Sequence, residues 1–291
     1  MAHQVPVPNG ALAPHRDPLD GTVELLPELA YLRCLLANVV FIGPPDAGDR
    51  GWVLVDAGVM GSKAFIERAA AQRFGNDAPP ACILLTHGHF DHVGVLESLA
   101  AEWDTPIYAH VLEHPYLDGS TSYPDPDPSV GGGLMSRLSR FYPTKPVDVS
   151  GCLMPLPANG EVPDLPGWRW LHTPGHSPGH VSFWRETDRT LIVGDAFVTT
   201  HAESAYATAT QEPEVHGPPA YFTVNWEEAR QSVRDLAALE PALVVSGHGR
   251  AMGGPLMQAA LHDLARDFDT IARPPHGRYV EHPMHHPRMG S

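Results

Sequence analysis

The stretch ILLTHGHFDHVGVLESLA, residues 83–100, decides how the rest of the chain is interpreted. It continues an apolar run over 81–86, which predicts a strand buried on both faces. Its second half has the apolar spacing of a helix and predicts one over 94–103. The turn between this strand and this helix holds three histidines and an aspartate within six positions.

The four polar residues of this turn fall at the carboxyl end of a strand, where α/β folds place their sites. His87 and His89 are two residues apart on an extended segment, so their side chains point the same way. Asp91 and His92 follow in the first turn of the helix. Ordinary loop histidines rarely cluster in this way, whereas imidazoles with a carboxylate are typical ligands of zinc and other borderline metals. The spacing therefore predicts a metal site.

Strands and helices alternate on both sides of this turn, in two similar halves. The predicted strands cover 39–43, 51–58, 106–110, 167–175, 180–186, 190–197 and 242–247, and the other predicted helices cover 62–75, 226–239 and 254–268. This alternation predicts two packed sheets with helices outside. We expect an irregular arm over 1–20, a single domain over 21–272 and a disordered His- and Pro-rich tail over 273–291.

Polar residues also follow other predicted strands, at Asp56, His172, His176, His180, Asp195 and His248. With the opening turn, they resemble the motifs of the metallo-β-lactamase superfamily. HGHFDH is similar to the HxHxDH signature of that family, and its other motifs are matched in order by DAG (56–58), HTPGHSPGH (172–180), GD (194–195) and SGHG (246–249). The resemblance spans roughly residues 20 to 270. It implies an αββα sandwich of two mixed sheets, with helices outside and two metals in a cleft at one edge.

The resemblance also implies a role for each motif residue. The expected ions are two Zn²⁺, with iron or manganese as alternatives. One ion would be held by His87, His89 and His176, the other by Asp91, His92 and His248, and Asp195 would bridge them. Asp56 would not bind an ion itself but would orient one of the ligands, as carboxylates near metal-bound imidazoles do. His172 and His180 flank the third motif without occupying its ligand position.

Such a site is expected to catalyse hydrolysis with a metal-bridging hydroxide. Asp91 would be the catalytic residue that orients the nucleophile and passes its proton to the leaving group. Asp195 at the bridging position resembles the glyoxalase II and lactonase-like branches, which implies a thioester, lactone or ester as substrate. The alternatives are a persulfide dioxygenase that uses a single iron, and a β-lactamase or phosphodiesterase activity of the same site.

A serine hydrolase is a further alternative, because GHSPG (175–179) reads as the G-x-S-x-G nucleophile elbow. That elbow requires a helix directly after the serine. Ser177 is followed instead by Pro178, Gly179 and a predicted strand. The local context therefore argues against a serine nucleophile.

Composition limits the partners and the compartment. The formal net charge of −15 argues against binding to a nucleic-acid backbone or to an anionic membrane surface. The N-terminus lacks the apolar core of a signal peptide, and no apolar run is long enough to span a membrane. Cys34, Cys82 and Cys152 are far apart, which favours a reduced, cytoplasmic protein. We expect a small-molecule substrate, and the sequence leaves the oligomeric state open.

The segment 111–149 lies between the two halves of the alternating pattern and is interpreted as a lid that selects the substrate. Leu134, Leu138 and Phe141 fall at i, i+4 and i+7, which predicts one apolar face of a short helix. Together with Met135 and Tyr142, they are expected to line a pocket over the metals, so that the substrate would carry an apolar portion. The alternative is that this face packs on the core.

Overall fold

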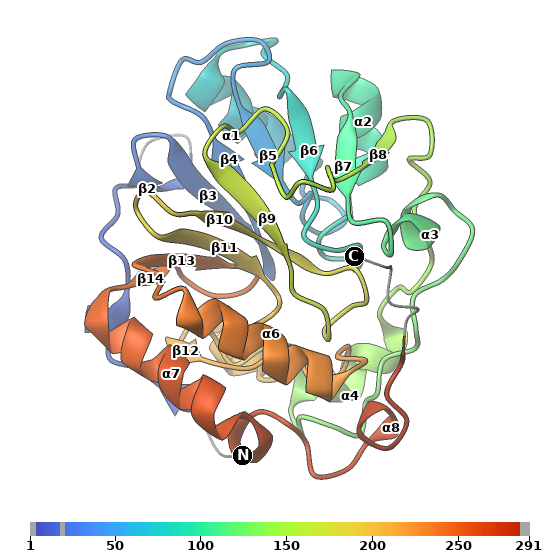
Figure 1. The fold of residues 1–291 in the computed structure, drawn as a ribbon. Coiled ribbons are helices and arrows are strands. Elements are labelled where there is room, and N and C mark those ends of the chain that lie inside the picture. The colour runs from blue at the N-terminus through green and yellow to red at the C-terminus, as the bar shows by residue number, and fades with distance from the viewer. Residues whose placement is uncertain (1–3, 18–20, 286–291) are drawn as a thin grey trace.

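Two β-sheets packed face to face form the centre of the protein (Figure 1). The computed structural model describes residues 4–17 and 21–285. Within these residues one sheet has seven strands, in the order β2 (Val23–Leu26), β3 (Leu29–Cys34), β4 (Ala37–Ile42), β5 (Val53–Val55), β6 (Cys82–Leu84), β7 (Ile107–Ala109) and β8 (Leu153–Pro155). The other has five, in the order β14 (Met252–Gly253), β13 (Leu243–Ser246), β11 (Thr190–Gly194), β10 (Val181–Arg185) and β9 (Trp168–His172).

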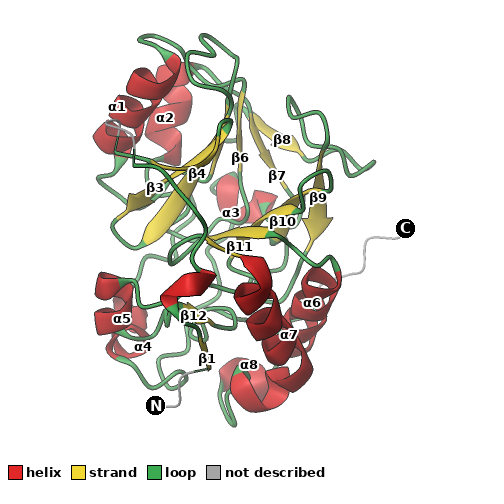
Figure 2. Ribbon diagram, turned by 90° about the vertical axis from the view of Figure 1, so that its left-hand side faces the viewer, coloured by secondary structure: helices red, strands yellow, loops and turns green. Residues whose placement is uncertain are grey.

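Helices cover the outer faces of both sheets. Figure 2 shows α1 (Lys63–Phe74) and α2 (Leu96–Trp103) on one side of the strands, and α6 (Trp226–Ala238) and α7 (Gly254–Ile271) on the opposite side. The predicted αββα sandwich is therefore confirmed. The shorter elements are β1 (Val5–Pro6), η1 (Asn9–Ala11), α3 (His114–Leu117), α4 (Leu134–Leu138), η2 (Ser139–Phe141), α5 (Ala205–Thr210), β12 (Glu214–Val215) and α8 (Arg278–Glu281).

The period of two along the strands produces three apolar layers, because successive side chains of a strand point to opposite faces. In β4, Phe41 packs outward under α1 and α2, whereas Val40 packs inward between the sheets. In β11, Val193 packs outward under α6 and α7, whereas Ile192 packs inward. The inner layer fixes the two sheets against each other, and with them the loops at their edges.

Parallel pairing brings the functional loops to one edge of the sandwich. Strands β5 and β6 run parallel in the first sheet, and β11 and β13 run parallel in the second. The carboxyl ends of parallel neighbours lie at the same edge, so the segments that follow these four strands meet there. These segments begin at Asp56, Leu85, Asp195 and Gly247.

The two ends of the chain differ from the sequence prediction. In the predicted irregular arm, Val5–Pro6 pairs with β12. In the predicted disordered tail, α8 forms and buries Tyr279, whose hydroxyl donates to the carbonyl of Asp125 over 2.6 Å. The prediction of disorder is wrong for the segment 278–284, because long-range contacts anchor a stretch that has no periodicity of its own. Residues 1–3, 18–20 and 286–291 lie outside the described part of the chain.

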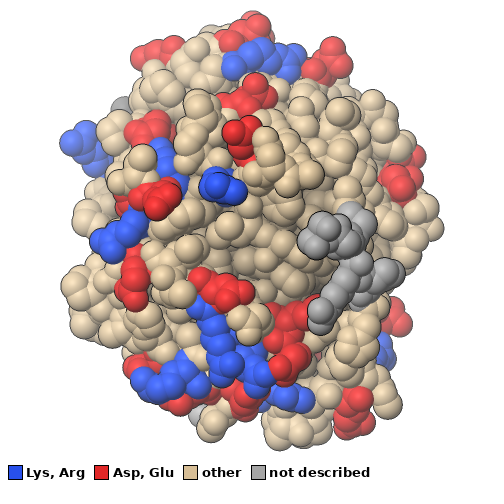
Figure 3. All heavy atoms as spheres, viewed as in Figure 1, with Lys and Arg blue, Asp and Glu red and all other residues tan. Residues whose placement is uncertain are grey.

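Within residues 4–17 and 21–285, no helix combines the length and the apolar character that crossing a bilayer requires. Charged side chains of both signs are intermingled on the face seen in Figure 3.

The packing of α8 predicts that Tyr279→Ala destabilises the protein. The change removes a buried ring and a hydrogen-bond donor, so we expect the free energy of unfolding to fall by about 2–3 kcal/mol. Urea unfolding followed by circular dichroism measures this loss. The control is Phe141→Ala, because Phe141 is a largely exposed ring and its removal should change stability by less than about 0.5 kcal/mol. Equal losses in the two variants would contradict the burial of Tyr279.

Candidate metal centre

All seven residues predicted as metal ligands come together in one buried cluster at the edge of the sandwich. Each of them is at most 7% exposed: His87, His89, Asp91, His92, His176, Asp195 and His248. Their ligand atoms form three overlapping groups, and within each group all atoms lie within 4.8 Å of one another: His87, His89 and His176; His87, His92 and Asp195; Asp91, His92 and His248. The loop after β6 supplies four of the seven residues, and loops of the second sheet supply the other three.

Two glycines let the cluster close around Asp195. Gly194 precedes it with φ +56°, a left-handed conformation that glycine adopts without strain. A Cβ atom at Gly194 would also lie 2.6 Å from Nε2 of His180. A Cβ atom at Gly247 would lie only 2.0 Å from Oδ1 of Asp195. The GD and SGHG motifs thus require glycine for close approach.

Acceptors outside the cluster fix the orientation of its imidazoles. Nδ1 of His92 donates to Oδ2 of Asp56 over 2.8 Å, and Nδ1 of His248 donates to the carbonyl of Leu36 over 2.8 Å. Because these acceptors carry no proton of their own to give, each ring must hold its proton on Nδ1. Nε2 of each ring therefore points into the cluster.

Two hydroxyl groups act in the same way on two further rings. Nδ1 of His87 lies 3.0 Å from Oγ1 of Thr86, a hydroxyl that donates to Asp56 and so accepts from the ring. Nδ1 of His176 lies 3.3 Å from Oγ1 of Thr223, which donates to a backbone carbonyl. Four of the five imidazoles are thereby held with Nε2 turned into the cluster, where Nε2 of His176 also lies 2.9 Å from Nδ1 of His89.

The inward atoms form a set of potential metal ligands around a buried carboxylate. Among the described residues, Nε2 of His87, Nε2 of His92 and Oδ1 of Asp195 are buried without a hydrogen-bond partner. Oδ2 of Asp195 lies 3.6 Å from Nε2 of His92, 3.6 Å from Nε2 of His176 and 3.1 Å from Nε2 of His248. Buried acceptors facing one another are costly unless a cation lies between them. The donor set therefore fits borderline divalent metals.

The pKa values of the clustered histidines are shifted by burial and by the Asp195 carboxylate. Burial lowers the pKa of His87 and of His89 well below the usual value, so both rings are neutral, as ligands must be. At His248 burial acts in the same direction, but the Asp195 carboxylate outweighs it and raises the pKa to about 9. A proton at His248 thus occupies a lone pair that a metal ion would use.

Comparison with known proteins identifies the family. Residues 32–248, well over half of the chain, match the family described as the metallo-beta-lactamase superfamily. The chain belongs to the metallo-beta-lactamase superfamily. A Bacillus subtilis (strain 168) protein named "Probable metallo-hydrolase YflN" is 42% identical over 236 residues, which cover 81% of this chain and 89% of that protein.

Solved structures share the superfamily fold. The structure described as "Crystal structure of TTHA1623 in a di-iron-bound form" is 26% identical and has a TM-score of 0.50, with 81% of this chain and 96% of that chain covered. A beta-lactamase domain protein from Burkholderia ambifaria is 22% identical and has a TM-score of 0.59, with 92% and 81% covered. This second similarity concerns the fold alone.

Two histidines that flank the third motif hydrogen-bond with the backbone and offer no free Nε2 to a metal. Nε2 of His180 accepts a hydrogen bond from the backbone N–H of Asp195 over 2.9 Å, so its lone pair is already used. Nε2 of His172 donates to the carbonyl of Pro178 over 2.9 Å, and its ring stacks on His110. Both residues hold loops that carry predicted ligands.

The predicted substrate pocket is only partly formed. A narrow pocket beside the cluster is lined by Leu36, Phe90, Asp91, Met135, Tyr142, Ala202, Thr208, Tyr221 and His248. Met135 and Tyr142 thus lie where the sequence analysis expected them. Leu134, Leu138 and Phe141 are 55%, 41% and 71% exposed and line neither this pocket nor the core. The prediction for these three is wrong, because the apolar pattern does not reveal which face of a short helix meets the protein.

A second cluster of histidines and glutamates was missed by the sequence analysis. His201, Glu214 and His216 have ligand atoms within 4.8 Å of one another. Nε2 of His216 lies 3.1 Å from Oε2 of Glu203, and Nδ1 donates to the carbonyl of Gly217 over 2.9 Å. Because both ring nitrogens are engaged, the arrangement is best explained as a buried ion pair. Burial opposes the charge of Glu203, but His216 and a backbone N–H outweigh it and lower the pKa to about 2.

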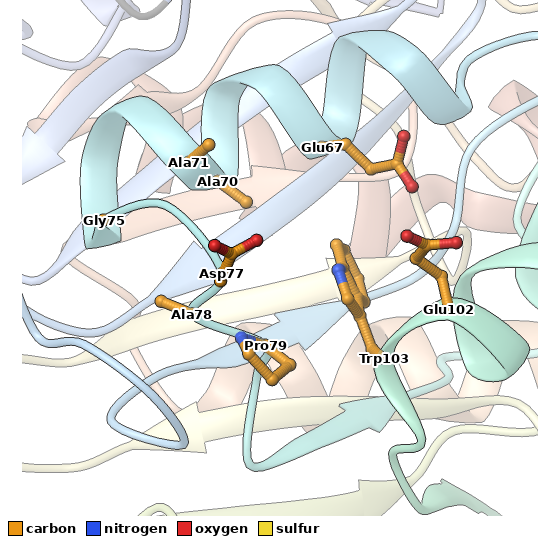
Figure 4. A pocket seen from close by; sticks show the side chains of 9 residues that line it. All are labelled: Glu67, Ala70, Ala71, Gly75, Asp77, Ala78, Pro79, Glu102 and Trp103. Atoms are coloured by element: carbon orange, nitrogen blue, oxygen red, sulfur yellow. The ribbon is translucent and has the colours of Figure 1, made fainter.

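Another pocket lies between α1 and α2, away from the seven residues (Figure 4). Its carboxylates, Glu67 and Glu102, both form ion pairs with Lys63, at 3.1 and 3.6 Å. Its other lining residues are small or apolar apart from Asp77. The pocket offers no group of convergent ligands comparable to the metal centre.

The contact of Asp56 with His92 predicts the effect of Asp56→Asn. The carboxylate accepts from the Thr86 N–H with one oxygen and from the Thr86 hydroxyl and His92 with the other, whereas the amide has a single acceptor oxygen, so the affinity for metal should fall roughly 10- to 100-fold. Chelator competition measures this affinity. Asp77→Asn is a matched control, because Asp77 also has a positive φ but is exposed. An unchanged affinity in Asp56→Asn would show that His92 is oriented by other groups.

Proposed function

We propose that the protein is a hydrolase that binds two divalent ions, most simply Zn²⁺, and cleaves a thioester, lactone or ester. The observation that carries this proposal is the position of Asp195 among inward-facing imidazoles from both sheets. His87, His89 and His176 would hold one ion, and Asp91, His92 and His248 the other, with Asp195 between them. The di-iron form of the relative TTHA1623 supports a two-ion site and keeps iron as an alternative to zinc.

When bound, the two ions supply a strongly acidified water and polarise the attacked carbonyl group. The protein's own contribution begins with Asp91, whose Oδ2 lies 3.5 Å from Nε2 of His248 and which lines the adjacent pocket. Its carboxylate can orient the nucleophile, hold the proton at its outer oxygen and release it to the leaving group. Tyr221 lines the same pocket, and burial raises its pKa well above the usual value, so its hydroxyl stays protonated as a donor.

A neighbouring groove supports a substrate with an apolar portion. It has a volume of about 460 Å³ and is lined by Leu35, Leu36, Val59, Met60, Phe90, Val93, Gly94, Pro143, Lys145, Pro146 and Val147. Leu36 and Phe90 also line the narrow pocket at Asp91, so the two spaces are adjacent. An acyl or alkyl chain in this groove would place its carbonyl end beside the metal centre.

The role of Asp91 predicts a large catalytic loss in Asp91→Asn. The variant keeps the size of the side chain but cannot carry the proton, so kcat should fall roughly 100-fold or more. The rate is measured on thioester, lactone, β-lactam and phosphodiester substrates, with elemental analysis of each preparation. The wild type should hold close to two ions. A fully metallated and fully active variant would contradict the assignment, and a wild type with one iron would favour the persulfide dioxygenase alternative.

The groove predicts a dependence on chain length. Met60→Ala and Val147→Ala each remove part of the apolar wall of the groove. The value of kcat/KM should therefore fall more for a decanoyl thioester than for an acetyl thioester. A difference of roughly 10-fold is expected, since each methylene in an apolar pocket contributes about 1 kcal/mol or more. Leu134→Ala is the matched control, because Leu134 lies outside the groove. Equal losses for both thioesters would show that the acyl chain of the substrate binds outside this groove.

A further inference from the structure

Glu113 is a fully buried carboxylate that no sequence motif marks. It belongs to the insertion and precedes α3. Its Oε1 accepts hydrogen bonds from the hydroxyl of Ser177 over 2.8 Å and from the backbone N–H of Gly179 over 2.7 Å. Its Oε2 accepts from the backbone N–H of Gly88 over 3.0 Å and from the hydroxyl of Tyr123. Four donors thus converge on one buried carboxyl group, an arrangement that is strong when every partner is satisfied.

Three of the four donors come from two loops that carry predicted ligands. Gly88 lies between His87 and His89, and Ser177 directly follows His176. Glu113 therefore joins the two segments that supply one group of ligands, although these segments extend from different sheets. The hydroxyl of Tyr123 also accepts from the N–H of Gly88 over 2.8 Å, and its ring packs on His89 at 4.5 Å between centroids.

The backbone at Gly88 and at Gly179 lies very close to Tyr123 and Glu113, which restricts movement of the two loops. A Cβ atom at Gly88 would lie 2.9 Å from the hydroxyl of Tyr123, and one at Gly179 would lie 2.7 Å from Cγ of Glu113. Both loops are thus held against the same carboxylate at a fixed distance. A shift of this carboxylate would move His176 relative to His87.

The other group of ligands is held by different partners. His92 is oriented by Asp56, and His248 by the carbonyl of Leu36. Asn38 further fixes the His248 loop, because its Nδ2 donates to the carbonyls of Ser246 and Gly249 over 2.9 and 2.8 Å. None of these contacts involves Glu113.

We propose that Glu113 is a positioning residue for one of the two metal positions, the one formed by His87, His89 and His176. This inference rests on the proposed two-ion site. It assigns the insertion a part in building the metal centre, in addition to any contact with substrate. Loss of the carboxylate should therefore lower the affinity for one ion selectively.

The test is Glu113→Gln, which keeps the shape of the side chain but replaces one acceptor oxygen with a donor group. Metal affinities are measured by chelator competition, and the Co²⁺-loaded protein gives an absorption spectrum for each position. We expect the affinity for one ion to fall roughly 10- to 100-fold, with loss of one set of Co²⁺ bands. The affinity for the other ion should stay within a factor of about two, in line with the independent anchoring of His92 and His248.

Two matched variants separate positioning from general destabilisation. Ser177→Ala removes one of the four donors, so it should weaken the same position by a smaller factor. Glu203→Gln also removes a buried carboxylate that accepts a backbone N–H, from Ala220, and should lower stability while both ions remain bound. If Glu113→Gln fails to fold, Ser177→Ala and Tyr123→Phe decide the question by the same measurement.

The outcomes also separate this inference from the proposed function. A wild type that holds fewer than two ions would overturn the two-ion proposal and the role of Glu113 with it. A wild type with two ions, and a Glu113→Gln variant with both affinities unchanged, would overturn the role of Glu113 alone. Equal weakening of both positions would overturn it as well.

Discussion

The structure depends on one electrostatic constraint, which is that several potential ligand atoms converge around a buried carboxylate. The outer protons of four imidazoles are accepted by Asp56, Thr86, Leu36 and Thr223, so Nε2 of each ring faces inward. Asp195 adds a carboxylate among them. Without positive charge such a cluster is unstable. Much of the surrounding hydrogen bonding is explained by the need to hold these acceptors in place.

The sequence predicted the parts of this arrangement that have a local pattern. The HGHFDH turn and the polar strand ends identified seven residues that the fold brings together, and short apolar runs located most of the central strands. The hairpin of β2 and β3 was missed, although the turn after β3 places the carbonyl of Leu36 against His248. Its function lies in a backbone atom, which side-chain patterns cannot reveal.

Glu113 and the insertion show a second limit of sequence reasoning. A single glutamate in a Pro- and Gly-rich segment has no spacing that distinguishes it, and only tertiary contacts show what it holds. The helix α4 shows the opposite case, because its i, i+4, i+7 pattern was clear but its apolar face is exposed. The apolar groove is built from four separate loops, at 35–36, 59–60, 90–94 and 143–147, so no contiguous pattern exists to find.

The division of the ligands between the two sheets has a consequence for folding. The first half of the chain contributes residues 87 to 92, and the second half contributes His176, Asp195 and His248. The proposed ions would therefore act as a cross-link between the halves, closing a long loop of chain much as a disulfide does. Because only the native state brings these ligands together, the stability of the fold becomes linked to the concentration of free metal. During synthesis the link through His176 can close before the link through His248, because His248 is the last of the seven residues to leave the ribosome.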